Sequence, residues 1–244
     1  MKIELRGVSK AYGRMRALDR VGLELGAGDV LGVVGANGSG KTTLLRCLAG
    51  VSAPDQGMIL YDEEEFQRGR QDLRRRLIFL PDFPFLFSEM SVIRHVGMVV
   101  RVYERERPGL EDQVVELLRE FDLLQLAERP LGSLSRGQAY KAALVAALAV
   151  DPELWLFDEP FASGMDPHGL QAFRRQVQSG VERGRIVVFS TQILEVVERM
   201  ATRVCVLHQG EVRAFEPVQT FRRAEEGAEG PLQEIFQALR AEPS

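Results

Sequence analysis

The hydrophobic residues of this 244-residue chain follow two different patterns. In the first 25 residues they alternate with polar residues, which is typical of short antiparallel strands with one face toward solvent. Further along they form brief unbroken apolar runs, and each run ends at a loop. Unbroken runs are typical of parallel strands that are covered on both faces. Parallel strands are therefore predicted at residues 30–34, 77–80, 154–157, 186–189 and 204–207.

Between these runs the apolar positions take helical spacing. Helices are predicted at residues 42–49, 111–121, 137–150 and 170–182. An alternation of strands and helices predicts the α/β class with a parallel sheet. The stretch from about 82 to 150 holds helical patterns and no strand, so it is predicted to be a helical subdomain inserted into the sheet. The chain is predicted to be one domain, 1–244, with an N-terminal antiparallel β-subdomain.

The C-terminal part shows a turn pattern and a closing tail. The segment 208–211 contains Gly210 and is predicted to join two short strands. The tail, about 217–244, is charged and glycine-bearing at 222–230, which predicts a linker. A short amphipathic helix is predicted at 232–239.

Composition narrows the class of protein. A chain with 45% hydrophobic residues can bury the core of one large domain, and its net charge of −4 argues against a nucleic-acid partner. No apolar run approaches the roughly 18–20 residues of a membrane span, and the N-terminus lacks the apolar segment of a signal peptide. A soluble, cytoplasmic protein is expected. Cys47 and Cys205 lie within apolar patterns and are predicted to be buried thiols.

A phosphate-binding loop follows the predicted strand 30–34. Its sequence, GANGSGKTT, fits G-x-x-x-x-G-K-[ST] and leads into a predicted helix. The glycines let backbone N–H groups turn toward phosphates, and the helix N-terminus favours an anion. Lys41 is expected to contact the β- and γ-phosphates of ATP, and the Thr42 hydroxyl to contact Mg²⁺. The predicted ATP-binding residues are Gly35, Asn37, Gly38, Ser39, Gly40, Lys41, Thr42 and Thr43.

Two acidic residues end the predicted strand 154–157. Asp158 is suited to hold Mg²⁺ through its water shell, and Glu159 to orient or deprotonate the attacking water. The alternative is a solvent-exposed strand cap, which the accompanying phosphate-binding loop disfavours.

A third motif carries a specific resemblance. The segment LSRGQ, residues 134–138, followed by a helix, resembles the signature sequence of ATP-binding cassette (ABC) ATPases, usually LSGGQ. Residues 163–166 match the D-loop position, and the order and spacing of the motifs resemble the family over nearly the whole chain. The resemblance implies a P-loop NTPase fold with a RecA-like sheet, and ATP and Mg²⁺ as cofactors.

The resemblance also implies a head-to-tail dimer, formed with a second copy or with a different cassette. Ser135 and Gly137, with Gln138 of the same motif, would cap the ATP bound to the opposite subunit, because a helix N-terminus favours an anion. Tyr12 occupies the family's adenine-stacking position; the alternative is an ordinary strand aromatic.

Two switch positions depart from the family pattern. Asp82 stands where a glutamine normally touches Mg²⁺ and the lytic water; a carboxylate can approach the metal through water but repels the γ-phosphate. Gln192 stands where a histidine normally reaches the γ-phosphate, and it cannot carry positive charge. Losing that charge predicts a loss of about 1–2 kcal/mol, a ~10- to 30-fold slower reaction. With Lys41 and Glu159 retained, a slow but competent ATPase is predicted; the alternative is a cassette that hydrolyses poorly beside a more active partner.

The segment LPDFPFLFSEMSV is rich in phenylalanine. In the family this area receives a cytoplasmic helix of a membrane subunit; the alternative places these phenylalanines in the helical subdomain core. Together with SRGQAYK, the segment resembles the ATPases of ABC-2 type exporters, which pair with a separate integral membrane permease. This implies a protein peripheral on the inner face of the membrane.

Other members of the family are the rival interpretations. Haem-exporter ATPases are close neighbours of the exporter type. Importer ATPases often carry a C-terminal regulatory domain, for which little chain follows the last predicted strands. Soluble cassettes acting on ribosomes or DNA usually have two cassettes or a long coiled-coil insertion, and neither pattern occurs in this sequence. A regulatory cassette that binds ATP without hydrolysing it is disfavoured by Glu159.

Overall fold

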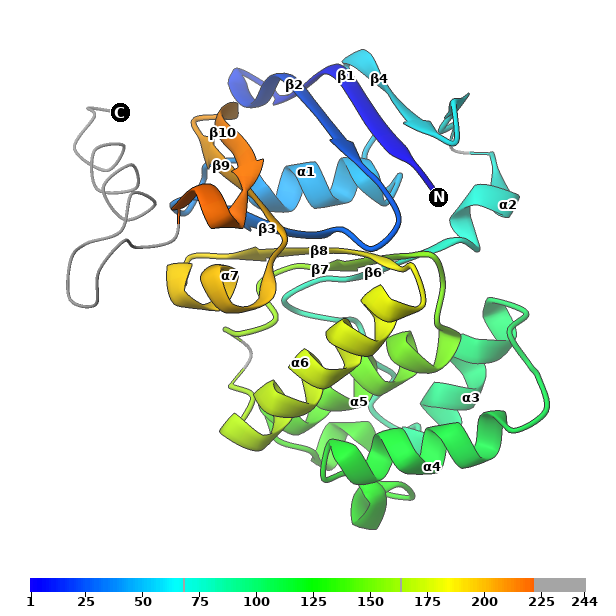
Figure 1. Ribbon diagram of the computed structural model, residues 1–244. Coiled ribbons are helices and arrows are strands. Elements are labelled where there is room, and N and C mark those ends of the chain that lie inside the picture. The colour runs from blue at the N-terminus through cyan, green and yellow to red at the C-terminus, as the bar shows by residue number, and fades with distance from the viewer. Residues whose placement is uncertain (68, 163, 222–244) are drawn as a thin grey trace.

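The computed structural model describes residues 1–67, 69–162 and 164–221, which form two sheets with helices between and below them (Figure 1). The first sheet is antiparallel, and its order is β2-β1-β4-β5. Its strands are β1 (Ile3–Tyr12), β2 (Met15–Leu25), β4 (Gln56–Tyr61) and β5 (Glu64–Glu65). This sheet is the predicted N-terminal β-subdomain.

The second sheet has six strands in the order β10-β9-β3-β8-β7-β6. All neighbours are parallel except β10, which pairs antiparallel with β9. Its strands are β3 (Val30–Val34), β6 (Leu77–Leu80), β7 (Leu154–Phe157), β8 (Ile186–Thr191), β9 (Arg203–His208) and β10 (Glu211–Pro217). Because β3 lies beside β8 and β9, the loop after it reaches the same edge as the ends of β7 and β8.

Seven α-helices and three short 3₁₀ helices connect the strands within the described residues. The α-helices are α1 (Lys41–Leu48), α2 (Gln71–Arg74), α3 (Val92–Val102), α4 (Leu110–Glu120), α5 (Arg136–Val150), α6 (Pro167–Glu182) and α7 (Leu194–Met200). The 3₁₀ helices are η1 (Leu124–Leu126), η2 (Leu131–Ser133) and η3 (Val218–Phe221). None of these helices is long and apolar enough to cross a membrane.

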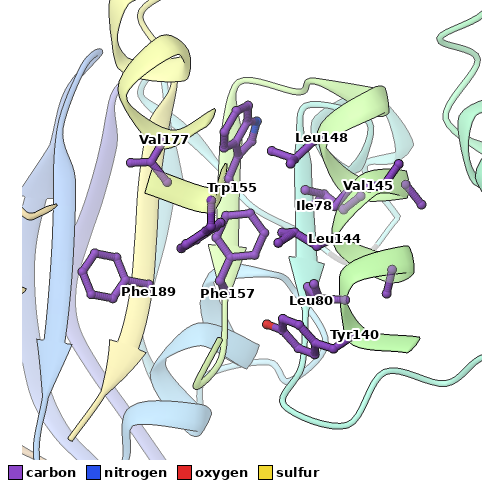
Figure 2. Close-up of a cluster of buried hydrophobic side chains, with 14 of the residues drawn as sticks. Ile78, Leu80, Tyr140, Leu144, Val145, Leu148, Trp155, Phe157, Val177 and Phe189 are labelled. Atoms are coloured by element: carbon purple, nitrogen blue, oxygen red, sulfur yellow. The ribbon is translucent and has the colours of Figure 1, made fainter. Parts of the chain in front are cut away.

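Both faces of the six-stranded sheet are buried, which explains the unbroken apolar runs. In β7, Leu154 and Leu156 belong to the cluster that includes α1 and the antiparallel sheet. Trp155 and Phe157 belong to the opposite cluster, with α5 and α6 (Figure 2). Alternate residues of one strand therefore enter two different cores, and α1 lies between the two sheets (Figure 1).

The inserted helical subdomain contains α3 and α4 and packs on α5. Helix α5 is buried continuously from Tyr140 to Val150, so it has no solvent face over that length. Its apolar side chains meet β6 and β7 (Figure 2), and the helix also packs on α3 and α4. The first turn of α5, at Arg136, is the part that reaches solvent.

The strands and helices predicted from the sequence are present, with ends shifted by a few residues. Strands β1 and β2 are longer than predicted, at 10 and 11 residues. The turn at 208–211 is confirmed: Gln209 and Gly210 both have positive φ angles, 47° and 82°, between antiparallel β9 and β10. Strands β4 and β5 and helices α2, α3 and α7 are additional elements. The predictions for 222–230 and 232–239, and Ser163 of the D-loop, lie outside the described residues.

Two expectations about side-chain burial have different outcomes. Cys47 and Cys205 are buried free thiols, as predicted, and burial raises their pKa to about 11 and about 12. The interpretation that the phenylalanines after Asp82 form a core is wrong, since Phe83, Phe85 and Phe87 are 70%, 84% and 48% exposed. The subdomain is filled instead by aliphatic residues of α3, α4 and α5.

Candidate active site

The loop between β3 and α1 fits closely against neighbouring strands. Gly38 and Gly40 have φ angles of 80° and 109°, a region that disfavours residues with a Cβ. A Cβ on Gly40 would lie 2.3 Å from the carbonyl oxygen of Ala17, and one on Gly35 would lie 2.3 Å from that of Leu207. The glycines of the motif are therefore required by the backbone itself.

A pocket of about 280 Å³ opens at this loop and brings most of the predicted site together. Its lining joins the loop, the N-terminus of α1, three carboxylates and two residues of β2. The residues are Met15, Ala17, Asn37, Gly38, Ser39, Gly40, Lys41, Thr42, Thr43, Asp82, Asp158 and Glu159. All three predicted acids, from the ends of β6 and β7, lie in this pocket.

The Lys41 ammonium is buried within the loop. Its Nζ donates to the carbonyl oxygens of Gly35 at 2.9 Å and Ala36 at 3.2 Å. It also lies 3.3 Å from Oε1 of Glu159. The lysine thus has a fixed position, with one compact charge ready to face phosphate oxygens.

Ser190, at the end of β8, positions both acids of β7. Its Oγ donates to Oδ1 of Asp158 at 2.7 Å and accepts from the backbone N–H of Glu159 at 2.8 Å. The Thr42 hydroxyl donates to the same Asp158 oxygen at 3.1 Å. Ser190 is not among the site residues predicted from the sequence. The available signal was a polar residue ending a buried run, at the sheet edge that carries the site.

The backbone of Glu159 has an unusual conformation, and the side chain of Gln192 is hydrogen-bonded to the phosphate-binding loop. Glu159 has a φ angle of 47°, in the left-handed region that non-glycine residues rarely occupy. Gln192 reaches from the end of β8 to the loop, where its Nε2 donates to Oδ1 of Asn37 at 3.0 Å. Gln192 is therefore within reach of the predicted phosphate site, with an amide donor.

Asp82 lies at the pocket and contacts the signature segment. Its Oδ1 accepts a hydrogen bond from Nη2 of Arg136 at 3.1 Å. The Arg136 guanidinium stacks on the ring of Phe83, 4.3 Å from its centroid. The loop after β6 that contains Asp82 and Phe83, called the switch loop below, is thus joined to the first residue of α5.

The signature residues form the N-terminus of α5. Ser135 is the N-cap: its Oγ accepts from the backbone N–H of Gln138 at 3.3 Å, and the Gln138 side chain accepts from the Ser135 N–H at 3.0 Å. A Cβ on Gly137 would lie 2.4 Å from the carbonyl oxygen of Gly164, so the signature and D-loop backbones touch.

Six predicted residues do not line this pocket, and two of them, Gly35 in the loop and Gln192 bonded to Asn37, adjoin it. Among the described residues, Ser135, Gly137 and Gln138 lie outside the lining of the chain's own pocket, and so does Tyr12. Tyr12 lies at the end of β1, 42% exposed, with its hydroxyl 3.3 Å from Oγ of Ser52. The roles of these residues in contacting ATP stay predictions.

The residues present fit ATP with Mg²⁺. The Ser39 hydroxyl is buried in the loop without a hydrogen-bond partner among the described residues, which suits a phosphate oxygen. Thr42 and Asp158 supply hard oxygen atoms. No group of three or more His, Cys, Asp or Glu in the described part of the chain could hold a metal alone. A Mg²⁺ ion held there would be completed by phosphates and water and would neutralise phosphate charge.

Comparison with known proteins places the chain among ABC proteins. A family model described as "ABC transporter" matches residues 18–162. The ABC-type transporter ATP-binding protein EcsA of Bacillus subtilis is 26% identical over 240 residues, covering 98% of this chain and 97% of EcsA. The sulfate/thiosulfate import ATP-binding protein CysA of Methylococcus capsulatus is 37% identical over 217 residues. That match covers 87% of this chain and 62% of CysA, so the chain spans less than two thirds of that relative.

Solved structures agree with the fold. A structure of an ATP-binding subunit of an ABC transporter has a TM-score of 0.89 and 27% identity, covering 98% of this chain and 100% of that chain. The dimeric bacterial ABC transporter cassette MJ0796 has a TM-score of 0.77 and 25% identity, covering 88% and 98%. With the phosphate-binding loop and the paired acids in one pocket, the chain belongs to the ABC transporter family as an ATP-binding cassette, an ATPase whose hydrolysis is coupled to transport.

Proposed function

We propose that this cassette hydrolyses Mg²⁺-ATP with Lys41, Asp158 and Glu159 and thereby drives a separate integral membrane subunit of an exporter. The observation that carries this proposal is an exposed apolar groove beside the switch loop. In the proposed reaction Lys41 holds the phosphates, Asp158 and Thr42 hold Mg²⁺, and Glu159 orients the attacking water. Asp82 and Gln192 adjust the rate of that step.

The groove lies where β6, α3 and α5 meet, and its volume is about 330 Å³. Alanines of α5 and the Pro-rich segment after β6 give it an apolar surface. The lining residues are Ile78, Phe79, Leu80, Pro81, Pro84, Phe85, Leu86, His95, Val99, Tyr103, Ala143, Ala146 and Ala147. Phe85, 84% exposed at its edge, packs edge-to-face on Phe87 with centroids 5.6 Å apart. Exposed aromatics beside an apolar groove favour a helix of a partner protein as the occupant.

The position of the groove explains how a membrane subunit would be coupled to ATP. Leu80 and Pro81 line the groove, and the next residue, Asp82, lines the nucleotide pocket. A helix seated in the groove therefore contacts the same short segment that enters the active site. The cassette would be peripheral on the inner face of the membrane through this contact.

Two cassettes are expected to act together. Ser135 and Gly137 lie outside the chain's own pocket, yet a helix N-terminus with a glycine beside it is suited to a phosphate. The proposed head-to-tail dimer brings this N-terminus to the ATP of the second cassette. The solved MJ0796 cassette is described as dimeric, which supports the pairing of two cassettes. A second copy and a different, more active cassette are both possible partners.

Docking is tested with purified protein and membranes. Inside-out vesicles from source cells that lack the cassette should bind the wild-type protein. Phe85→Ser with Phe87→Ser should weaken this binding by ~10-fold or more, because two large apolar contacts are lost. Val115→Ser on α4, which changes another exposed apolar residue away from the groove lining, is the control. Equal binding by the double variant would contradict the proposed docking surface.

The direction of transport has two candidates. The resemblance of the phenylalanine-rich and signature segments to ABC-2 type ATPases favours export, whereas the 37% identity with CysA favours import. We expect cells that carry Glu159→Gln to accumulate the transported molecule inside if the system exports it. Importer cells would instead be depleted of it. Comparing small molecules inside and outside such cells with wild type decides between the two directions.

A further inference from the structure

The lining of the nucleotide pocket is polar apart from two residues of β2. The phosphate-binding loop, the start of α1 and three acids supply its charged and hydrogen-bonding groups. Met15 and Ala17 are the apolar residues in the lining. A nucleotide is divided in the same way, since its phosphates are charged and its base is flat and largely apolar. With the phosphates on the loop, the base is expected at Met15 and Ala17.

Strand β2 lies directly against the loop at this point. A Cβ on Gly40 would lie 2.3 Å from the carbonyl oxygen of Ala17, so the backbones of the strand and the loop are in contact. Met15 precedes Ala17 by two positions, and residues two apart in a strand lie on the same face. The side chain of Met15 is 63% exposed, whereas that of Ala17 is 6% exposed. Met15 therefore offers the larger free apolar surface to a base.

The aromatic residue next to Met15 has contacts elsewhere. Tyr12 pairs with Met15 across the hairpin but does not line the pocket. The Tyr12 hydroxyl lies 3.3 Å from Oγ of Ser52, and the Lys10 ammonium lies 5.7 Å from the centroid of the Tyr12 ring. Within this cross-strand pair, Met15 is thus the residue that lines the nucleotide pocket.

The thioether of a methionine is suited to a base and is also open to oxidation. Its sulfur is polarisable and makes favourable contacts with aromatic rings. With hydrogen peroxide, a sulfur lone pair attacks one oxygen, the O–O bond breaks, an S–O bond forms and the other oxygen leaves as water. Sulfur loses two electrons and the peroxide gains them. The sulfoxide is polar, so it no longer offers an apolar surface.

We propose that Met15 contacts the base of the bound nucleotide and is a modification site, at which oxidation by a peroxide weakens nucleotide binding. The two thiols of the chain, Cys47 and Cys205, are buried and so are poorly accessible to the same oxidant. The inference rests on the proposed function in one respect, namely that the pocket binds Mg²⁺-ATP. It adds that the affinity of the cassette for ATP responds to oxidants through one exposed side chain.

The base contact is tested by locating oxidised methionines by mass spectrometry after a short exposure to hydrogen peroxide. Met58 is an internal reference, because it is 39% exposed and lies on β4 outside the pocket lining. Mg²⁺-ATP should slow the oxidation of Met15 ~3-fold or more, since oxidation follows exposure, and should leave that of Met58 unchanged. Mg²⁺-tripolyphosphate, which has no base, should protect neither residue. Equal protection of Met15 by tripolyphosphate, or no protection by ATP, would overturn the contact.

The effect of oxidation is tested by calorimetric titration with ATP and with tripolyphosphate, before and after peroxide. Oxidised wild type should bind ATP ~3- to 10-fold more weakly, with its affinity for tripolyphosphate unchanged. Methionine sulfoxide reductases should restore the affinity for ATP. Met15→Leu keeps an apolar side chain without sulfur, so its affinity for ATP should be equal before and after peroxide.

Met58→Leu is the matched control and should lose affinity for ATP on oxidation as wild type does. A loss of the same size in Met15→Leu, or no loss in wild type whose Met15 is oxidised, would overturn the proposal. Unoxidised wild type that binds neither ATP nor tripolyphosphate would contradict the proposed function instead.

Discussion

The ammonium of Lys41 lies 3.3 Å from the carboxylate of Glu159, and both side chains are largely buried. The lysine that is expected to hold phosphates is therefore paired with the acid that is expected to orient the attacking water. A phosphate must compete with Glu159 for the same cation. The two functions of the pocket, binding and hydrolysis, are thus opposed at one contact.

This contact predicts opposite effects on binding and turnover. Glu159→Gln should reduce turnover ~100-fold or more, because the base or water-orienting group is lost. The same change should tighten ATP binding ~3- to 10-fold, because Lys41 no longer has a competing anion. Phosphate release and equilibrium binding measure the two effects. Glu159→Asp keeps the charge, and with it we expect ATP affinity near wild type. Weaker ATP binding by Glu159→Gln would contradict this account.

Gln192 predicts a gain of activity. Its amide already reaches the loop, with Nε2 3.0 Å from Oδ1 of Asn37. Gln192→His would place a ring N–H donor of similar reach there and allow positive charge to develop. Turnover should rise ~10- to 30-fold, the reverse of the loss expected from the missing charge. Gln192→Ala, which removes the donor, should be slower than wild type. A histidine variant no faster than wild type would show that the switch position does not limit the rate.

Because Ser190 is hydrogen-bonded to both Asp158 and Glu159, its substitution is predicted to reduce turnover. Ser190→Ala removes the donor to Asp158 at 2.7 Å and leaves the Glu159 N–H without its acceptor. We expect turnover to fall ~10- to 100-fold, because misplacing a catalytic group by a small distance is costly. Thr191 is equally buried and follows Ser190, so Thr191→Val is a matched control at the next position. Unchanged turnover in Ser190→Ala would mean that the backbone alone positions the acids.

Periodicity and motif order predicted the sheet and most of the residues that line the pocket, for a physical reason. Strand β7 buries both faces, so its residues are all apolar and end abruptly at Asp158. The loop glycines are fixed by backbone contacts 2.3 Å from a potential Cβ, so this motif can be recognised without the fold. These signals are local to the chain.

The features that sequence reasoning missed depend on contacts between distant segments. Ser190 holds Asp158 across 32 residues of chain, and Arg136 holds Asp82 across 54. Strand β4 was missed because its first residues, Gln56 and Gly57, are exposed and not apolar. Whether Phe85 lies in a core or at the surface depends on which residues fill the helical subdomain, which one-dimensional patterning does not determine.

Because the backbones of Gly137 and Gly164 touch, a larger residue at position 137 is predicted to reduce turnover. A Cβ at residue 137 would lie 2.4 Å from the Gly164 carbonyl oxygen, which is closer than atoms approach. Gly137→Ala must separate the signature from the D-loop, so turnover should fall ~10-fold or more. Binding of ATP to the chain's own pocket should be unchanged, because Gly137 does not line it. Gly132→Ala, where the nearest atom is a serine Cβ at 3.0 Å, is a milder comparison.

The buried ammonium of Lys141 ties α5 to α6 and predicts a pH-dependent stability. Its Nζ donates to Oδ2 of Asp166 at 2.8 Å, and Asp166 also caps α6 by accepting from the Gly169 N–H at 2.7 Å. The hydrogen bond from Lys141 lowers the pKa of Asp166 below its ordinary value. Asp166→Ala should cost about 1–2 kcal/mol, since it removes the cap and the partner of Lys141, and the half-exposed Asp166 carboxylate makes the pair weaker than a fully buried one. Asp166→Asn keeps a good cap and should cost less.

The direction of the pH effect follows from the lowered pKa of Asp166. A carboxyl group whose pKa is lower in the folded state stabilises the fold above its unfolded pKa of about 3.9. That stability is lost as the pH falls through the lower, folded value. Lys141→Met replaces the buried charge with an apolar side chain of similar length, so it should be within about 1 kcal/mol of wild type at pH 7. Below about pH 4 it should become the more stable protein, because wild type then holds an unpaired buried ammonium. Urea unfolding of both proteins from pH 7 to pH 3 measures the crossover, and a wild-type advantage that grows toward low pH would contradict the pairing.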